Sequence, residues 1–294
     1  MKKLFLAYFV VLAIFGFAQK SETLRLKKYK IAQLSDSLRE SSGLNFFREK
    51  LYTFNDSGNA PDLFEIDKNS GKILKILKTN LINRDWEALT NNGNCFYIGD
   101  FGNNLGTRKD LKIYKIPFRN DSLKMDSAKT IRFFYPEQID FTPKNIRNNF
   151  DGEAMIFLDE NLHIFTKEWV TDTVSHYLVN PELSENQPAK KLESYDTGFV
   201  VTDASFFDNK LYVVGYTKKM KVFLMIFEKD ETDNLFFNKP AKKYFLGMAY
   251  SIGQVEGIAA TENGIYISCE NFNIKVKKVP QSLYFVPLKI LGKR

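Results

Sequence analysis

Cysteine and histidine are both scarce in this sequence, with two of each among 294 residues. A structural zinc site takes four nitrogen or sulfur ligands, so these residues are poorly suited to one, and a scaffold of several disulfides is excluded. A serine-type triad would need His163 or His176 as its base. Both fall in strand patterns, where a buried, hydrogen-bonded packing role is expected.

Several catalytic and binding motifs are also absent. The sequence has no Gly-x-Ser-x-Gly elbow and no Gly-x-x-x-x-Gly-Lys phosphate loop. Its net charge is +7, but acidic and basic residues are mixed along the chain, without a basic block or an aromatic nucleic-acid motif. We therefore expect no nucleic-acid partner. The composition, 44% hydrophobic and 26% charged, is that of an ordinary globular protein and excludes disorder and coiled coil.

The first 18 residues predict a secretory signal peptide. Lys2 and Lys3 precede an apolar run from Leu4 to Phe17, and Ala18 offers a small residue for cleavage. The run is shorter than the roughly 20 residues of a membrane-spanning helix, so an uncleaved anchor is the weaker alternative. We expect an exported protein, periplasmic or extracellular, whose mature chain (19–294) is one domain, a monomer, without a transmembrane helix.

The rest of the sequence predicts an all-β fold. Short runs of β-branched and aromatic residues, such as Cys95–Ile98 and Leu211–Val214, are separated by Asn, Asp, Gly and Lys. Five repeats each begin with a short polar or acidic residue that is followed by small and apolar residues. These starting residues are Ser42, Glu87, Glu153, Asp203 and Glu256. Four-stranded units at about 40–50 residues are typical of a β-propeller. We predict five blades, with six as the alternative.

The ends of the repeat region predict how the ring closes. The fifth unit ends after its third strand, and a spare strand at Lys28–Gln33 precedes the first unit. A long second interval indicates an insertion around Gln138–Asn149. Cys95 and Cys269 fall in blades two and five, which are not neighbours, so both are predicted to be free, buried thiols.

In a propeller, the starts of the inner strands and the loops after the second strands meet on one face. Carboxylates that converge there repel one another and raise their pKa values unless a cation neutralises them, and Ca²⁺ suits such oxygen ligands. The predicted metal ligands are Glu87, Glu153, Asp203 and Glu256. The predicted ligand-binding residues are Asp56, Asp100, Lys167, Trp86 and Trp169. The alternative is that each acid accepts backbone hydrogen bonds and only joins neighbouring blades.

Two resemblances accompany these patterns. The segments Ser41–Leu44, Asn55–Gly58, Asn83–Leu89 and Tyr97–Asn103 resemble secreted bacterial β-propellers of the phytase-like or esterase-like group. Glu256-Gly-Ile is similar to the Glu-Gly start of calcium-dependent propellers of the gluconolactonase type. That second resemblance implies that Glu256 binds metal.

Three function classes follow. The first is an exported propeller that binds a small molecule, a glycan or a protein on an acidic face. The second is a calcium-dependent hydrolase of phosphate esters, esters or lactones, with Asp100 as a possible base. The third is a structural interaction protein without a small-molecule site. Binding is the first choice, because a propeller fold alone does not indicate a reaction.

Overall fold

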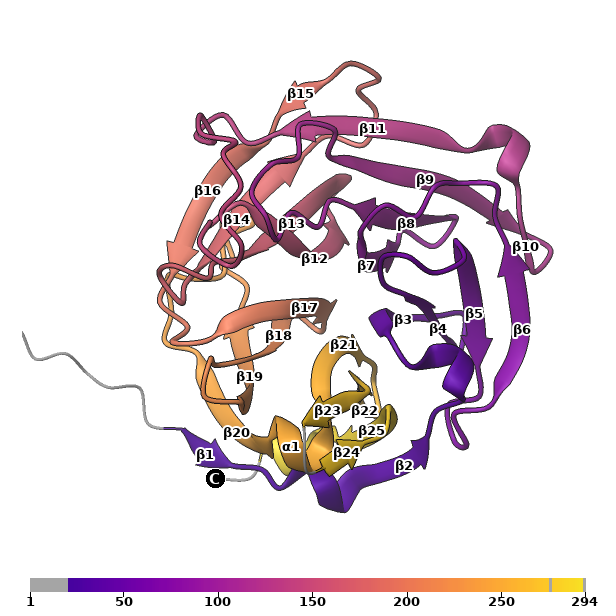
Figure 1. Cartoon of the computed structure of the whole chain (residues 1–294), viewed down its shortest axis with the longest axis vertical. Helices are drawn as coiled ribbons and strands as arrows, with labels where there is room; N and C mark the ends of the chain where they lie inside the picture. The colour runs from indigo at the N-terminus through magenta and orange to yellow at the C-terminus, as the bar shows by residue number, and fades with distance from the viewer. Residues whose placement is uncertain (1–20, 275–276, 293–294) are drawn as a thin grey trace, which may run out of the picture.

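The computed structural model describes residues 21–274 and 277–292. They form five main antiparallel sheets arranged as sectors of a ring (Figure 1). The predicted five-bladed all-β propeller is confirmed, and the six-bladed alternative is wrong. The predicted signal peptide, residues 1–18, lies outside the described residues. Within the described ranges, every helix is too short or too polar to cross a bilayer.

Blades one and two are meanders whose first strand lies nearest the ring centre (Figure 1). Blade one contains β3 (Ser41–Phe47), β4 (Lys50–Asn55), β5 (Asp62–Ile66) and β6 (Ile73–Lys78). Blade two contains β7 (Trp86–Asn91), β8 (Cys95–Asp100), β9 (Lys112–Arg119) and β11 (Lys129–Phe134), with β10 (Ser122–Leu123) beside β9.

Blades three and four repeat this arrangement. Blade three contains β12 (Asp151–Leu158), β13 (Asn161–Lys167), β14 (Val174–Val179) and β16 (Lys190–Tyr195). Blade four contains β17 (Val200–Phe207), β18 (Lys210–Tyr216), β19 (Lys221–Glu228) and β20 (Lys242–Met248). Two short strands extend outer edges in parallel: β15 (Gln187–Pro188) beside β11, and β1 (Glu22–Thr23) beside β20. Added pairing of this kind covers sheet edges that would otherwise be exposed.

Blade five joins the two ends of the chain. It contains β21 (Gln254–Ala260), β22 (Gly264–Glu270), β25 (Ser282–Pro287) and, outermost, β2 (Lys30–Gln33). The antiparallel register pairs Gln33 with Ser282. The predicted closing strand is thus confirmed, although the 3-10 helix η1 (Leu26–Tyr29) occupies its first two residues. Consecutive inner strands contact one another around the whole ring, namely β3, β7, β12, β17 and β21.

The remaining elements are short and lie in connections. They are η2 (Asp36–Leu38), η3 (Met125–Ser127), α1 (Ala249–Ile252), α2 (Leu288–Leu291) and the small hairpin of β23 (Phe272–Ile274) and β24 (Lys277–Val279). The predicted insertion around Gln138–Asn149 is the long connection between β11 and β12, and it contains no strand or helix.

The core fills the spaces between blades, where alternate strand residues interlock. Between blades one and two, the ring of Tyr52 on β4 lies 4.9 Å from that of Phe96 on β8, which lies 5.1 Å from that of Phe118. Such edge-to-face pairs add about 0.5–1.5 kcal/mol beyond the area that they bury. Cys95 and Cys269 are both free and buried, as predicted.

Both histidines have the packing role that the sequence predicts. His163 and His176 are buried on adjacent strands, with His163 Nδ1 2.7 Å from His176 Nε2. His176 Nδ1 in turn lies 2.9 Å from Oε1 of Glu193, whose carboxylate accepts the backbone N–H groups of Phe236 and Phe237. Burial lowers the pKa of His163 to about 3, so that ring is neutral. This network is part of the packing of blades three and four.

Candidate functional site

Each inner strand contains a β-bulge close to its start. The ladder skips one residue in each blade, namely Gly43, Glu87, Glu153, Thr202 and Glu256. A bulge turns its extra residue away from the regular alternation of the strand. In three of the five blades that residue is a glutamate, and all three glutamates line one cavity. The bulge therefore explains why buried strands present carboxylates at the ring centre.

The cavity has a volume of about 160 Å³ and opens on the face where the inner strands start. Its lining is mostly polar. The lining residues are Ser42, Asp56, Glu87, Asn104, Glu153, Lys167, Trp169, Tyr216, Gln254, Glu256 and Glu270. We call this the acidic cavity. It contains five carboxyl groups against one lysine, so acidic groups dominate its lining.

Three carboxylates converge on one side of this region. Asp56, Asp85 and Glu87 each offer an oxygen, and the three oxygens lie within 4.8 Å of one another. Glu87 is only 4% exposed, and its carboxylate has no hydrogen bond or ion pair among the described residues. A buried charge without a partner costs several kcal/mol. The cluster is therefore an incomplete site unless a cation or protons neutralise it.

Gly102 allows the two acids of blade two to approach each other. A Cβ atom at this position would lie 2.4 Å from Glu87 Oε1 and 2.5 Å from Asp85 Oδ2. The backbone N–H of Gly102 also donates to the carbonyl of Asp85 at 3.2 Å. Only glycine leaves room for both carboxylates beside this loop.

Lys167 lies on the opposite wall, in blade three. Its ammonium group is 3.0 Å from Glu153 Oε1, and both side chains are nearly fully buried. The same ammonium lies over the rings of Trp169 and Tyr216, at 5.4 Å and 5.7 Å from their centroids. Burial alone would lower the pKa of Lys167, but Glu153 and the other nearby acids raise it well above its usual value. Lys167 is therefore protonated at neutral pH.

Blade five adds two more carboxylates. The side-chain amide of Gln254 donates to Glu256 and to Glu270, at 2.7 Å in each case. Burial raises the pKa of Glu256 to about 7 and that of Glu270 to about 9, and the proximity of the two acids adds to the rise for Glu270. At neutral pH, part of the negative charge on this wall is neutralised by bound protons.

The three carboxyl groups of the cluster in blades one and two also have raised pKa values. Burial, followed by the charge of Asp56, raises the pKa of Asp85 to about 7. Burial and the charge of Glu153 raise the pKa of Glu87 well above its ordinary value. Burial also raises the pKa of Asp56. Raised pKa values at a set of converging acids are typical of sites that bind cations or exchange protons.

Asp203 does not lie in the acidic cavity, contrary to the sequence-based expectation. The bulge residue of blade four is Thr202, so Asp203 is turned by one strand position relative to Glu87, Glu153 and Glu256. Its carboxylate accepts the backbone N–H groups of Ala204, Leu44 and Ile258, at 2.8, 3.3 and 2.7 Å. Asp203 thus joins blades four, one and five, which is the alternative role considered for these acids.

Asp100 and Trp86 also lie away from the cavity. The carboxylate of Asp100 is fully buried between Arg108 at 2.9 Å and Lys112 at 3.2 Å. It also accepts the backbone N–H of Asp85 at 3.2 Å, so it supports the loop that carries that acid. The ring of Trp86 packs between blades one and two, and its N–H donates to the carbonyl of Ile82.

The sequence interpretation missed Asp85 and Tyr216 as site residues. Asp85 precedes the inner strand by one residue, within the Asn83-Arg-Asp-Trp-Glu segment that carries the family resemblance. That segment was a usable signal. Tyr216 occupies the same loop position in blade four as Lys167 does in blade three, but a tyrosine at a strand end has no distinctive pattern.

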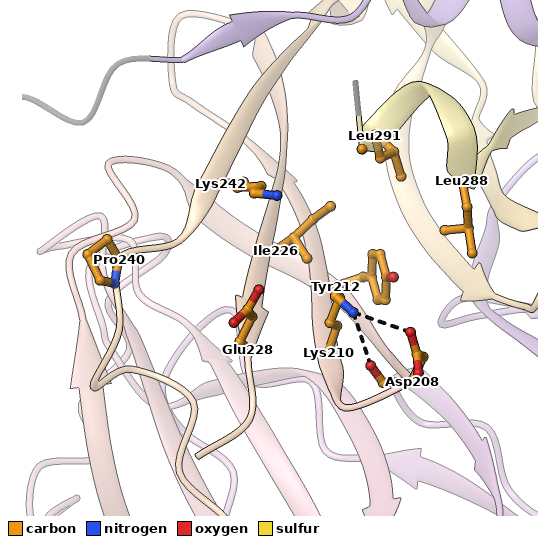
Figure 2. A pocket seen from close by; sticks show the side chains of 10 residues that line it. Asp208, Lys210, Tyr212, Ile226, Glu228, Pro240, Lys242, Leu288 and Leu291 are labelled. Carbon is orange, nitrogen blue, oxygen red and sulfur yellow. Dashed lines mark hydrogen bonds and ion pairs between the residues drawn. The ribbon is translucent and has the colours of Figure 1, made fainter. Parts of the chain in front are cut away.

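A second cavity lies on the opposite face, between blades four and five (Figure 2). It has a volume of about 220 Å³, and its floor is formed by Tyr212, Ile226 and Leu291. Its lining holds equal numbers of acids and lysines: Lys210 lies 3.3 Å from Asp208 Oδ2, and Glu228 and Lys242 add one charge of each sign. Among the described residues, the one group of three carboxylates whose oxygens converge is that of Asp56, Asp85 and Glu87, so the acidic cavity is the better candidate site.

No protein-family model and no curated protein matches the sequence. Solved structures with a similar shape include a candidate oxidoreductase (glucose dehydrogenase) from Thermus thermophilus, 11% identical over 87% of this chain and 98% of that chain, with a TM-score of 0.49. A candidate 6-phosphogluconolactonase from Bacteroides uniformis is 13% identical over 86% and 71% of the two chains, with a TM-score of 0.36. A hypothetical protein from Leishmania major is 13% identical over 90% and 92%, with a TM-score of 0.46. These likenesses are too distant to assign an activity.

Proposed function

We propose that the protein binds calcium in the acidic cavity and that the ion, together with Lys167, holds an oxygen-rich small molecule. The observation that carries this proposal is the convergence of Asp56, Asp85 and Glu87 on one point, with Glu87 buried and unpaired. Oxygens that share one calcium ion lie at most about 5 Å apart, given bonds of about 2.3–2.6 Å. The observed spacing fits one ion.

Calcium suits this cluster better than magnesium does. Calcium accepts six to eight oxygens in irregular geometry, whereas magnesium requires a near-ideal octahedron. The three carboxylates come from loops and a bulge of two blades, and the cavity supplies Ser42 and Asn104 as further oxygen donors. Glu153 forms an ion pair with Lys167, so it belongs to the wall that faces the ligand.

Export is part of this proposal. The charged start and apolar run within residues 1–18 favour secretion, and extracellular calcium modules bind at about 10⁻⁴–10⁻³ M. The resemblance of Asn83–Leu89 and Tyr97–Asn103 to secreted phytase-like or esterase-like propellers supports the same location. In such a compartment, calcium would occupy even a weak site.

The other wall can position a ligand. The Lys167 ammonium can pair with an anionic or carbonyl oxygen, and the indole N–H of Trp169 is buried without a hydrogen-bond partner among the described residues. A free donor beside a cation favours a ligand that is rich in oxygen acceptors. A small carboxylate, a phosphate ester or a sugar acid has this chemistry.

A second function is calcium-dependent hydrolysis of an ester or lactone. The observation in its favour is that Glu256 lines the same cavity, outside the proposed ligand set, with its pKa raised to about 7 by burial. A carboxylate with this pKa is suited to general-base catalysis at neutral pH. In this reaction, bound calcium would polarise the scissile carbonyl, and Glu256 would take the proton of the attacking water.

Calcium titration of the thermal melting temperature (Tm) tests the binding proposal. At 100 times the dissociation constant, a ligand bound only by the native state adds about 2.7 kcal/mol of stability. For a domain of this size, that gain raises the Tm by about 5–10 °C. Glu87→Gln should weaken this calcium effect strongly, with little change in the Tm of the metal-free protein. A Tm that does not respond to calcium overturns the proposal.

Asp203→Asn is the matched control. It also replaces a buried acid near the start of an inner strand, but this acid accepts three backbone hydrogen bonds outside the cavity. This variant should lose about 1–3 kcal/mol of unfolding free energy, so its Tm should fall even without calcium. The rise in Tm on adding calcium should stay as in the wild type. If both variants lower the Tm and keep the calcium shift, both acids only join blades, and the metal site is refuted.

A further inference from the structure

A larger pocket lies beside the acidic cavity on the same face. Its volume is about 690 Å³, and it is lined by Lys144, Ile146, Arg147, Trp169, Val170 and Lys218. We call this the rim pocket. Trp169 lines both spaces, so the two are neighbours at this residue. A ligand held in the acidic cavity can therefore extend past Trp169 into the rim pocket.

The rim pocket is apolar and cationic, the reverse of the cavity next to it. Ile146 is 46% exposed and Val170 is 59% exposed, which is unusual for side chains that could pack inside. Lys144 and Lys218 each have an acidic neighbour, Asp140 and Asp172. The guanidinium of Arg147, by contrast, has no hydrogen bond, ion pair or ring contact among the described residues.

The pocket is held in place by the loops that carry the acidic cavity. Asn148 donates its side-chain N–H groups to the carbonyls of Asn103 and Asn104, at 3.2 and 3.0 Å. The backbone N–H of Val170 donates to the side chain of Asn149 at 3.1 Å. Asn104 itself lines the acidic cavity. These bonds fix the distance between the two spaces.

Ile146 occupies an unfavourable backbone conformation. Its φ angle is +47°, in the left-handed region that β-branched residues rarely adopt. An exposed isoleucine gains little packing energy to offset this strain. Strained residues of this kind cluster at ligand sites, where the side chain is needed for contact.

We propose that the rim pocket binds the distal part of the ligand, an apolar group that ends in an anion such as a carboxylate, phosphate or sulfonate. Arg147 would pair with the anion, while Ile146 and Val170 would contact the apolar part. The inference rests on the proposed function for the position of the ligand's other end. It narrows the substrate class from any oxygen-rich molecule to an amphiphilic anion.

Fluorescence titration with anilinonaphthalene sulfonate, an apolar anion, tests the rim pocket directly. N-phenylnaphthylamine has the same rings without the sulfonate and serves as the neutral probe. Arg147→Gln should weaken binding of the sulfonate by about tenfold and leave the neutral probe unchanged. Lys242→Gln removes a lysine from the cavity of Figure 2 and is the control, which should leave both affinities unchanged.

Ile146→Asn separates contact from stability. Asparagine tolerates the left-handed region, so this variant should melt at or above the wild-type Tm, yet bind both probes more weakly. If the two probes bind with equal affinity, and Arg147→Gln changes neither affinity, the anion site at Arg147 is overturned.

The probe titrations are run in EDTA and do not depend on calcium, whereas the calcium shift of the Tm is measured separately on the same variants. If the probes bind as expected but calcium does not raise the Tm, the calcium proposal has failed. If calcium raises the Tm but Arg147→Gln does not weaken binding of the sulfonate, the rim-pocket proposal has failed.

Discussion

Gly102 provides a sharp test of the metal site, because alanine adds one carbon atom at a known place. That Cβ would lie 2.4 Å from Glu87 Oε1 and 2.5 Å from Asp85 Oδ2, and ordinary contact begins near 3.4 Å. Glu87 Oε1 would thus have to move by about 1.0 Å. Metal ligands hold their distances within about 0.2 Å, so two of the three carboxylates would leave the ligand set.

The expected result of Gly102→Ala is a 10- to 100-fold weaker calcium affinity with a small effect on folding. The loss is of the size seen when groups that orient metal ligands are removed. The atoms in collision are the ends of flexible side chains, and Gly102 is not among the positive-φ glycines, so alanine is tolerated by the backbone. Stability in EDTA should therefore stay close to that of the wild type.

Isothermal titration calorimetry with CaCl₂ measures this affinity directly, and urea unfolding in EDTA measures stability. Gly292→Ala is the control, because among the described residues a Cβ there would meet only Leu288 O at 4.0 Å. It should bind calcium like the wild type. If Gly102→Ala also binds calcium with wild-type affinity, the two carboxylates beside this glycine are not ligands, and the reasoning is refuted.

Three further predictions concern the rest of the molecule. Because burial raises the pKa values of Glu256 and Glu270 to about 7 and 9, the native state holds protons that the unfolded chain releases. Urea unfolding in EDTA should therefore show stability rising by a few kcal/mol as the pH falls from 9 to 5, and a fall would contradict the burial of these acids. A thiol reagent should find no reactive cysteine in the native protein and two, Cys95 and Cys269, after unfolding. Glu193→Gln should destabilise the protein by about 1–3 kcal/mol without changing the calcium shift, since its carboxylate pairs with buried groups away from the cavity; a changed shift would refute that separation.

The blades were predictable because their signal is local. Alternating apolar residues and turn residues define each strand within a few positions, and the runs Cys95–Ile98 and Leu211–Val214 fall within β8 and β18. Closure by the strand before the first repeat followed from counting strands. The convergence of Glu87, Glu153 and Glu256 on one cavity was predictable because each lies at the same place in its repeat.

Asp203 and Asp100 lie away from the expected place because of features that sequence repeats do not encode. Asp203 was aligned with Glu87, but the bulge of blade four falls one residue earlier, and a shift by one position moves a strand side chain to the other face. Asp100 was expected at the cavity as an unpaired acid. Its cationic partners, Arg108 and Lys112, come from a later segment, so the sequence around Asp100 does not reveal them. Spatial partners of this kind depend on loop conformation.

The pairing of β2 with β25 also determines when the molecule can finish folding. Gln33 and Ser282 are separated by 249 residues, so blade five has no outer strand partner until nearly the whole chain has been synthesised. Until then, β2 has no partner strand, and bringing such distant segments together carries a loop-closure cost that grows with the logarithm of the separation. Blades one to four are each built mainly from consecutive strands and can form earlier. A chain still being synthesised is therefore an open arc, and the acidic cavity is completed only once blade five supplies Glu256 and Glu270.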